Sequence, residues 1–384
     1  MTVVILDGTR TPFAKWKSNL ASYSSKQLGA HALASLVEKY PEIKNADGVI
    51  LAQVIQGGAG QNAARQVAIE AGISPSTPAI TLNNVCLGGI ASIADATRRI
   101  LLKEGDLYIV GGMDSMTNAP FTLNIRAGHS FGNATLVDSL ETDGLSCAIS
   151  EQSMGAITDT YNKEYSINRQ EQDEWAYLSH QRAKAAQNAG RLQSEITPIP
   201  DVLSEDNGIR PNTSIEKLAS LRTAFHQDGT ITAGNASQMT DGASIGIITT
   251  AEKAKQLNQQ PLATVIDWAE TAGPDFSLQT KPSDAIKKIL DKQQLTIEDI
   301  DLFEINEAFA SVVIASINDL QLDPEKVNVN GGAIALGHPL GGTGFRLVLT
   351  LAHELKRRGG GKGIATLCGG GGQGMAILIE VPKQ

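Results

Sequence analysis

One unit occurs twice in this chain, and it limits the folds that the sequence can adopt: a buried strand, a reactive residue, a helix, a further strand and a pair of glycines. In the first copy, residues 79–82 form the strand, Cys86 is the reactive residue, and residues 90–102 have the apolar spacing of a helix. Residues 106–110 form the further strand and end at Gly111-Gly112. This alternation predicts an α/β protein with largely parallel, buried strands.

The second copy lies near the end of the chain. Residues 327–330 are strand-like, His338 stands where Cys86 stood, residues 345–355 form the helix, and residues 363–367 form the next strand before another glycine cluster. Self-similarity of this kind predicts two similarly folded halves. Cys86 and His338 would occupy equivalent turns and could meet at the interface between the halves.

The segment between the two copies has a different composition. It is richer in Asn, Gln, Ser and Thr, and it is broken by Pro198, Pro200 and Pro211. This is typical of an inserted, loop-rich region that carries specificity or oligomer contacts. We expect three parts around a shared core: an N-terminal half at 1–115 and 240–261, an inserted loop domain at 116–239, and a C-terminal half at 262–384.

The composition is that of a well-buried globular chain, with 41% hydrophobic and 19% charged residues. A net charge of -9 argues against nucleic acid as a partner, because binding to phosphate backbones needs clustered Lys and Arg. The first residues lack the basic segment of a signal peptide, and no apolar run approaches the length of a membrane span. Cys86, Cys147 and Cys368 are odd in number, so we expect a reducing cytoplasm rather than a disulfide framework.

An anionic substrate would have to be met by a local cluster of basic side chains. The best source is one stretch of the inserted region, which holds His180, Arg182, Lys184, Arg191, Arg210, Lys217 and Arg222. The alternative is that these side chains lie on solvated helix faces.

Cys86 follows a strand and precedes a helix, so we expect its thiol near the positive end of the helix, which favours the thiolate. A thiol of ordinary pKa is only about 3% ionised at pH 7, so a nearby base matters. Gly88-Gly89 would let backbone and ligand approach closely. The alternative is an inert core cysteine.

His338 lies between Gly337 and Pro339, and the internal repeat places it opposite Cys86. Because histidine titrates near neutral pH, it is the obvious base for that thiol. The alternative is a loop histidine that bonds to a backbone carbonyl. No metal is expected, since no second His or carboxylate stands at ligand spacing from His338.

Cys368 ends a strand and precedes the glycine run 369–374, whose N–H groups could bind an oxyanion. The run fits the dinucleotide fingerprint G-x-G-x-x-G, but residues 375–379 have a strand pattern where the fingerprint must open a helix. Asn306 could orient a water or an oxyanion, or it could cap a helix that begins at Glu307. Two thiols, an imidazole and an amide are the groups that acyl transfer coupled to carbon–carbon bond chemistry requires.

Several motifs, in order along the whole chain, resemble those of the thiolase family, especially its acetyl-CoA acetyltransferases. They are Arg10-Thr11-Pro12-Phe13, residues 57–66, Asn84-Val85-Cys86-Leu87-Gly88-Gly89, Gly111-Gly112-Met113-Asp114-Ser115-Met116, Gly234-Asn235-Ala236-Ser237, Asn306-Glu307-Ala308-Phe309, Gly337-His338-Pro339 and Cys368 with its glycines. The resemblance implies a five-layer αβαβα fold of two similar halves with an inserted loop domain. It also implies a homotetramer, assembled as a dimer of dimers.

The resemblance further implies an acyltransferase that condenses two acetyl-CoA reversibly to acetoacetyl-CoA and CoA by ping-pong chemistry, with CoA thioesters as substrates and no separate cofactor. By their match, Cys86 would carry the acetyl group, His338 would take its proton, and Cys368 would deprotonate the second acetyl-CoA. Asn306 would hold a water that forms one oxyanion hole with His338. The backbone N–H groups of Cys86 and Gly370 would form the other.

The same resemblance implies residues that bind coenzyme A. Ser237 and Arg222 match positions near its pantetheine and nucleotide parts, while Met154, Ala308 and Phe309 match apolar walls of the site.

One position departs from the family pattern. Many short-chain members have His before the Met-Gly of the loop domain, where this chain has Ser153. Losing an imidazole there does not by itself create room for an alkyl tail, so we expect a small acyl pocket.

Two other classes of protein share parts of this pattern. A decarboxylating β-ketoacyl synthase would need a second catalytic His in place of the Asn306 motif, which this chain lacks. A non-catalytic acyl-CoA-binding protein would be expected to have lost a thiol or His338, whereas this chain keeps Cys86, His338 and Cys368.

Overall fold

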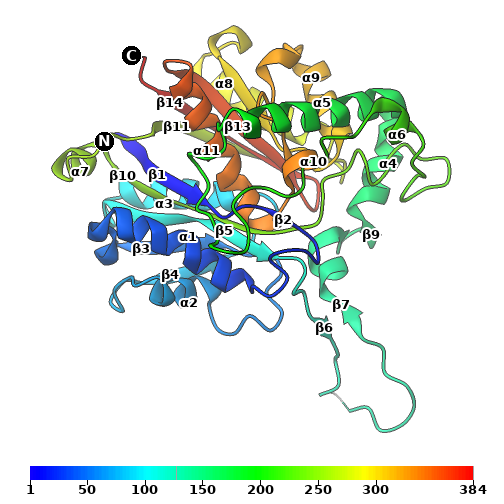
Figure 1. The fold of residues 1–384 in the computed structure, drawn as a ribbon, viewed down its shortest axis with the longest axis horizontal. Coiled ribbons are helices and arrows are strands. Elements are labelled where there is room, and N and C mark those ends of the chain that lie inside the picture. The colour runs from blue at the N-terminus through cyan, green and yellow to red at the C-terminus, as the bar shows by residue number, and fades with distance from the viewer. Residues whose placement is uncertain (127, 384) are drawn as a thin grey trace.

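The structure is a computed structural model that describes residues 1–126 and 128–383, and its centre is a large mixed sheet (Figure 1). One part of this sheet has the strand order β4-β3-β5-β10-β1. Its strands are β1 (Val3–Arg10), β3 (Gly48–Ala52), β4 (Ala79–Leu82), β5 (Leu107–Ser115) and β10 (Thr240–Thr250).

The other part of the sheet belongs to the C-terminal third of the chain and has the order β12-β13-β14-β11. Its strands are β11 (Ala263–Ala272), β12 (Leu302–Ile305), β13 (Gly361–Gly369) and β14 (Gln373–Val381). The two parts are joined where β1 pairs with β11, and this pairing covers only Val4 with Thr264 and Ile5 with Ala263.

The expectation of largely parallel strands is wrong. Only the pairs β3–β4, β3–β5 and β12–β13 are parallel in the described sheet, and the remaining pairs are antiparallel. The reason is that β10 returns beside β5 and β14 returns directly beside β13, and chains that turn back on themselves pair in antiparallel fashion.

Helices cover both parts of the sheet in layers. Helices α1 (Ser25–Lys39) and α2 (Ala63–Glu70) pack on the outer face of the first part, around an apolar core that includes Leu33 and Ile109. Helices α3 (Gly88–Leu101) and α11 (Leu340–Arg357) lie between the two parts, around Ile93 and Phe345.

The outer face of the second part is covered by α8 (Lys281–Gln293), α9 (Ala310–Leu320) and α5 (Arg169–Asn188), which pack around Ile289 and Phe303. The sequence of layers is therefore helix, sheet, helix, sheet, helix. This confirms the expected five-layer α/β architecture (Figure 1).

The two central helices touch through glycine. A Cβ atom built on Gly344 would lie 2.6 Å from the backbone nitrogen of Ile90, so a larger residue would push α11 away from α3. This close approach brings the first turns of the two helices together, and Cys86 and His338 precede those turns.

The region between β5 and β10 contains short elements and long connections. Its strands β6 (Phe121–Thr122) and β7 (Val137–Asp138) form an arm that projects from the body, as Figure 1 shows. A buried ion-pair cluster joins the region to β1, because Arg10 contacts Glu195 at 2.7 Å and Asp206 at 2.6 Å. Such a cluster favours one arrangement of the chain, since each buried charge needs its partner.

The remaining elements are short. They are β2 (Ala14–Lys15), β8 (Ser146–Cys147), β9 (Gln152–Ser153), α4 (Met154–Glu164), α6 (Ile215–Ala219), α7 (Ala251–Gln256), α10 (Ala333–Leu336), the 3-10 turns Pro41–Asn45, Ile297–Asp299 and Pro324–Lys326, and the π-helical turn Leu140–Leu145. Among the helices that the structure describes, none combines the length and the apolar character needed to cross a membrane.

Two local predictions are wrong. Residues 327–330 form no strand; only Val327 makes a bridge to Phe303, and the side chain of Asn328 then bonds to both the N–H and the C=O of Ile305 at 2.8 Å. The side-chain amide of Asn328 thus makes the two hydrogen bonds to Ile305 that the backbone of a neighbouring strand would otherwise make. Gly111-Gly112 also does not end its strand, since β5 continues to Ser115.

Candidate active site

Cys86, His338 and Cys368 line one cavity of about 70 Å³ at the interface between the two halves. Gly370 also lines it, although these four residues come from three separate segments of the chain. The structure thus brings together the two thiols and the imidazole that the sequence singled out.

Cys86 lies in the turn between β4 and α3. The preceding residue, Val85, has a φ of 48°, a left-handed conformation that a β-branched residue seldom adopts. The backbone N–H groups of Cys86 itself and of Gly370 each act to lower the pKa of the Cys86 thiol. Both N–H groups therefore lie near the place where a thioester oxygen on this sulfur would lie.

Burial nevertheless dominates the acidity of this thiol. It raises the pKa of Cys86 to about 12, and the nearby Asp114 carboxylate adds to the effect, against the two N–H groups. The helix α3 begins only at Gly88, with Leu87 as its N-cap. The expected thiolate is therefore not the resting form of Cys86, and a base must take its proton.

His338 has a defined tautomer. Its Nδ1 lies 2.6 Å from Oγ1 of Thr343, and that hydroxyl donates to the carbonyl of Pro339 at 2.8 Å. Because the hydroxyl has given its only proton to Pro339, Nδ1 must carry the hydrogen that Thr343 accepts. The free lone pair is then on Nε2, which can accept a proton.

The backbone before the imidazole is also constrained. Gly337 has a φ of 106°, and a Cβ atom there would collide with the side chain of Thr240. Thr240 Oγ1 in turn accepts the N–H of His338 at 3.1 Å. Burial, assisted by the Arg346 cation, lowers the pKa of His338 to about 3, so the imidazole is neutral at neutral pH.

Asn306 is the first residue after β12, and its Nδ2 lies 3.4 Å from Nε2 of His338. The alternative that Asn306 caps a helix beginning at Glu307 is wrong, because α9 begins at Ala310 with Phe309 as its N-cap. Asn306 Oδ1 is buried and has no hydrogen-bond partner in the part of the chain that the structure describes. A buried carbonyl oxygen of this kind suits a water or a substrate donor.

Cys368 is the eighth residue of the nine-residue strand β13 and is 1% exposed. Burial raises the pKa of its thiol, and the neighbouring Cys86 adds to that rise. The glycine run then turns at residues 370–372, and β14 begins at Gln373, which confirms that no helix follows the run. Gly370 therefore lines the cavity from a turn between two strands and does not belong to a dinucleotide-binding loop.

Four of the residues expected to contact coenzyme A line the cavity: Met154, Ser237, Ala308 and Phe309. Two of these segments pair with each other, since the N–H of Ser237 donates to the carbonyl of Ala308 at 3.0 Å. The fifth, Arg222, is exposed and lies outside the lining of the cavity.

Ser153, the position that departs from the family pattern, is the N-cap of α4. Its hydroxyl accepts the N–H of Ala156 at 3.2 Å. Here the side chain stabilises the start of the helix that carries Met154, and it does not line the cavity.

Several residues at the site were not found from the sequence. The cavity wall also includes Val85, Leu145, Ser146, Leu278 and Leu340. An aromatic pair was missed as well, in which Phe225 meets Phe309 edge to face with 6.4 Å between ring centres. Thr343 could have been found from the sequence, because it is a hydroxyl residue only five positions after His338. No sequence pattern indicates the apolar residues of the wall.

The basic stretch of the inserted region makes mainly internal contacts. Arg182 pairs with Glu325, Arg191 donates to Asn330, and Lys217 donates to the carbonyl of Asn212. Nδ1 of the buried His180 accepts the N–H of Arg210, and its pKa is lowered to about 4 by burial and then by Arg210. The contacts of these side chains are mostly with other parts of the protein. None of the seven basic residues of this stretch lines the cavity of Cys86.

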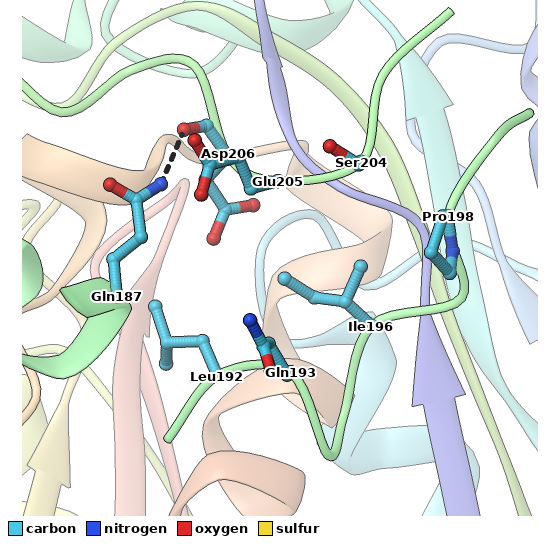
Figure 2. Close-up of a pocket in the computed structure, with 8 residues that line it drawn as sticks. All are labelled: Gln187, Leu192, Gln193, Ile196, Pro198, Ser204, Glu205 and Asp206. Atoms are coloured by element: carbon cyan, nitrogen blue, oxygen red, sulfur yellow. Dashed lines mark hydrogen bonds between the residues drawn. The ribbon is translucent and has the colours of Figure 1, made fainter. Parts of the chain in front are cut away.

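A larger cavity of about 410 Å³ lies in the inserted region (Figure 2). It is lined by Gln187, Leu192, Gln193, Ile196, Pro198, Ser204, Glu205 and Asp206. The Asp206 carboxylate is already bound by Arg10, and the lining includes no thiol or imidazole. The smaller cavity is the candidate active site, because two thiols and an imidazole meet in it.

Comparison with known proteins agrees with this geometry. The models for the thiolase N-terminal domain and the thiolase C-terminal domain match residues 3–252 and 259–381. This chain therefore belongs to the thiolase family. It is 45% identical to a probable acetyl-CoA acetyltransferase of Mycobacterium tuberculosis, with 99% of each chain covered.

Two further similarities extend over the full length. The chain is 42% identical to an acetyl-CoA acetyltransferase of Chromobacterium violaceum, with 100% of each chain covered. Its fold matches the crystal structure of the Acat5 thiolase of Ascaris suum in complex with coenzyme A, with a TM-score of 0.94, 37% identity and full coverage of both chains.

Proposed function

We propose that this chain is an acetyl-CoA C-acetyltransferase, which condenses two acetyl-CoA reversibly to acetoacetyl-CoA and CoA through an acetyl group on Cys86. The observation that carries the proposal is the meeting of Cys86, His338 and Cys368 in one small, mostly apolar cavity. Membership of the thiolase family and the names of its relatives support acyltransferase activity.

In the first half-reaction, Nε2 of His338 takes the thiol proton of Cys86, and the sulfur attacks the carbonyl carbon of acetyl-CoA. The developing oxyanion is held by the N–H groups of Cys86 and Gly370, both of which favour the charged form of the Cys86 sulfur. The bond to the CoA sulfur then breaks, and the CoA thiolate leaves with the proton from His338.

In the second half-reaction, Cys368 first gives its proton to Nε2 of His338 and then removes a proton from the methyl group of a second acetyl-CoA. The resulting enolate oxygen would be held by His338 Nε2–H together with a water on Asn306, and its carbon attacks the acetyl group on Cys86. As the bond to Cys86 breaks, that sulfur takes the proton from Cys368, and His338 returns the other proton to Cys368. No cofactor is needed beyond the CoA thioesters.

Coenzyme A would enter past the apolar walls made by Met154, Ala308 and Phe309, with Ser237 near its pantetheine part and the exposed Arg222 near its nucleotide part. The structure of the Ascaris suum relative in complex with coenzyme A supports this choice of ligand.

The small cavity favours short acyl chains. Met154, Leu278 and Phe309 bound a space of about 70 Å³. Because a hydrophobic pocket discriminates by about 1–3 kcal/mol per methylene, a five-carbon chain is tolerated and long chains clash. The test is kcat/KM for thiolysis of 3-ketoacyl-CoA substrates of increasing length. We expect acetoacetyl-CoA to be the best substrate; a preference for chains of about eight carbons or more would contradict the assignment.

We also propose a homotetramer, a dimer of dimers, working in the reducing cytoplasm, where the three free thiols stay reduced. The projecting arm supports the assembly, because it exposes apolar side chains: Phe121 62%, Phe131 98% and Leu136 59%. Exposed apolar surface of this kind marks a protein contact. Analytical ultracentrifugation should show four copies per particle, and removal of the arm should reduce that number.

A further inference from the structure

Asp114 joins the two halves of the active site by hydrogen bonds to backbone groups only. Its side chain is fully buried, on the eighth residue of β5. The carboxylate accepts the N–H of Gly341 at 2.7 Å, that of Ile55 at 3.0 Å and that of Val54 at 3.2 Å. Gly341 belongs to the C-terminal half, whereas Val54 and Ile55 follow β3 in the N-terminal half.

Each of these segments supports one reactive group. Gly341 lies in the first turn of α11, three residues after His338, and the N-cap residue Pro339 offers no side-chain cap. Asp114 therefore caps the helix of the base from the opposite half of the molecule. Val54 and Ile55 belong to the apolar cluster against which Cys86 packs.

The Asp114 carboxylate makes the thiol of Cys86 harder to ionise. Its charge helps to raise the pKa of Cys86, which opposes formation of the thiolate. A neutral residue would favour the thiolate but could not accept hydrogen bonds from every one of these N–H groups. The retention of a buried charge here therefore points to geometry rather than to the acidity of the thiol.

We propose that Asp114 is a positioning residue for acyl transfer, which holds the base His338 in line with the thiol of Cys86 by tying α11 to the loop after β3. This rests on the proposed function. The titratable groups around Asp114 and Cys86 are His338 from the loop before α11, Cys368 from β13 and Asp241 from β10.

The test is Asp114→Asn, which keeps the shape of the side chain but turns one acceptor oxygen into a donor. Alkylation of Cys86 by iodoacetamide should shift to lower pH, because a nearby negative charge is lost. At the same time, kcat for acetoacetyl-CoA thiolysis should fall by about 10–100-fold with KM within about twofold, since small misplacements of a reacting group are costly. A purely structural role would not move these two quantities in opposite directions.

Asp241→Asn is the matched control, because Asp241 is a buried carboxylate on the neighbouring strand that bonds to Ser115 and to the N–H of Thr117 and not to α11. Its kcat should stay within about threefold of the parent. If Asp114→Asn does not fold, Asp114→Glu serves instead: it keeps the charge, so alkylation should not shift while kcat still falls.

Equal losses of kcat in the variants of Asp114 and Asp241, or a kcat of Asp114→Asn within twofold of the parent, would overturn the positioning role. A crystal structure of Asp114→Asn in which His338 and Gly341 have not moved would do the same without any substrate. Absence of thiolysis in the parent enzyme would instead contradict the proposed function.

Discussion

The two halves of the molecule use equivalent positions for different purposes. Asp114 is the eighth residue of β5 and stands opposite Gly242, while Cys368 is the eighth residue of β13 and stands opposite Gly374. In the N-terminal half, the residue at this position, Asp114, binds the first turn of α11 from the other half. In the C-terminal half, the residue at this position is Cys368, whose thiol lines the cavity.

The residues that follow β3 and β12, the strands that run parallel to β5 and β13, differ in the same way. Gln53 follows β3 and donates to Ser25 and to the carbonyl of Ile55, inside its own half. Asn306 follows β12 and is directed at Nε2 of His338. The fold thus provides equivalent places in both halves, and in the C-terminal half the polar group of Asn306 is left facing His338 at the cavity.

The reactive groups are thus divided unequally. The N-terminal half provides Cys86, the proposed nucleophile, and the C-terminal half provides His338, Cys368 and Asn306. This division can be tested by removing groups from one half at a time.

The largest effect is expected for His338→Ala. Both half-reactions should fall by about 10²–10⁴-fold, because the base is needed for acyl transfer and its Nε2–H for the enolate. Acetyl transfer to Cys86 and acetoacetyl-CoA thiolysis would be measured separately. His353→Ala, a histidine on α11 that lies outside the cavity, is the control and should change both rates little.

A loss confined to one half-reaction in His338→Ala would mean that a different group serves as the base in the other. The division of labour between the halves would then need revision.

Cys368→Ala should have a narrower effect. Carbon–carbon bond formation and cleavage should fall by about 10³-fold, because general acid–base catalysis is lost, while Cys86 still accepts an acetyl group. Single-turnover release of CoA from acetyl-CoA, compared with steady-state thiolysis, separates the two steps. Cys147→Ala provides a buried thiol outside the cavity as control. Rapid condensation by Cys368→Ala would contradict the role assigned to that thiol.

The smallest effect concerns stability at the far end of α11. Burial alone would raise the pKa of Glu354, but hydrogen bonds from Arg357, Arg358 and Asn330 outweigh it and lower the pKa to about 2. A folded-state pKa below the unfolded value means that the stabilisation is present above pH 4.5 and is lost as pH falls toward 2. Because both arginines are partly exposed, we expect about 1–2 kcal/mol.

Denaturant unfolding of Glu354→Gln should therefore show a lower free energy of unfolding at pH 7 and a smaller difference from the parent near pH 3. Catalytic rates should change little, since Glu354 lies in the last turn of α11, whereas His338 precedes the first turn. An equal difference at both pH values would contradict the ionic origin of the stabilisation.

Much of this arrangement could be predicted from the sequence, because the signals are local. The strand at 79–82 coincides with β4, and a helix follows both Cys86 and His338, which line one cavity as expected, although residues 327–330 form no strand. Apolar periodicity indicates such elements within a few residues of their bounds.

The rest depends on contacts between distant residues. Asn328 replaces a strand partner through its side chain, and Asp114 bonds to Gly341, 227 positions away. The neutral state of His338 and the high pKa of Cys86 follow from burial by several segments at once. No local pattern reports these effects, so the helix N-terminus suggested a thiolate that the folded chain does not favour.

In the proposed reaction, the thiol of Cys86 in the N-terminal half is the nucleophile, and His338 in the C-terminal half is its base. The most direct measurement is mass spectrometry of peptides from the protein incubated with acetyl-CoA and quenched in acid. We predict one acetyl group on the Cys86 peptide, absent in Cys86→Ser and strongly reduced in His338→Ala. Acetylation found only on Cys147 or Cys368, with the Cys86 peptide unmodified, would contradict the account.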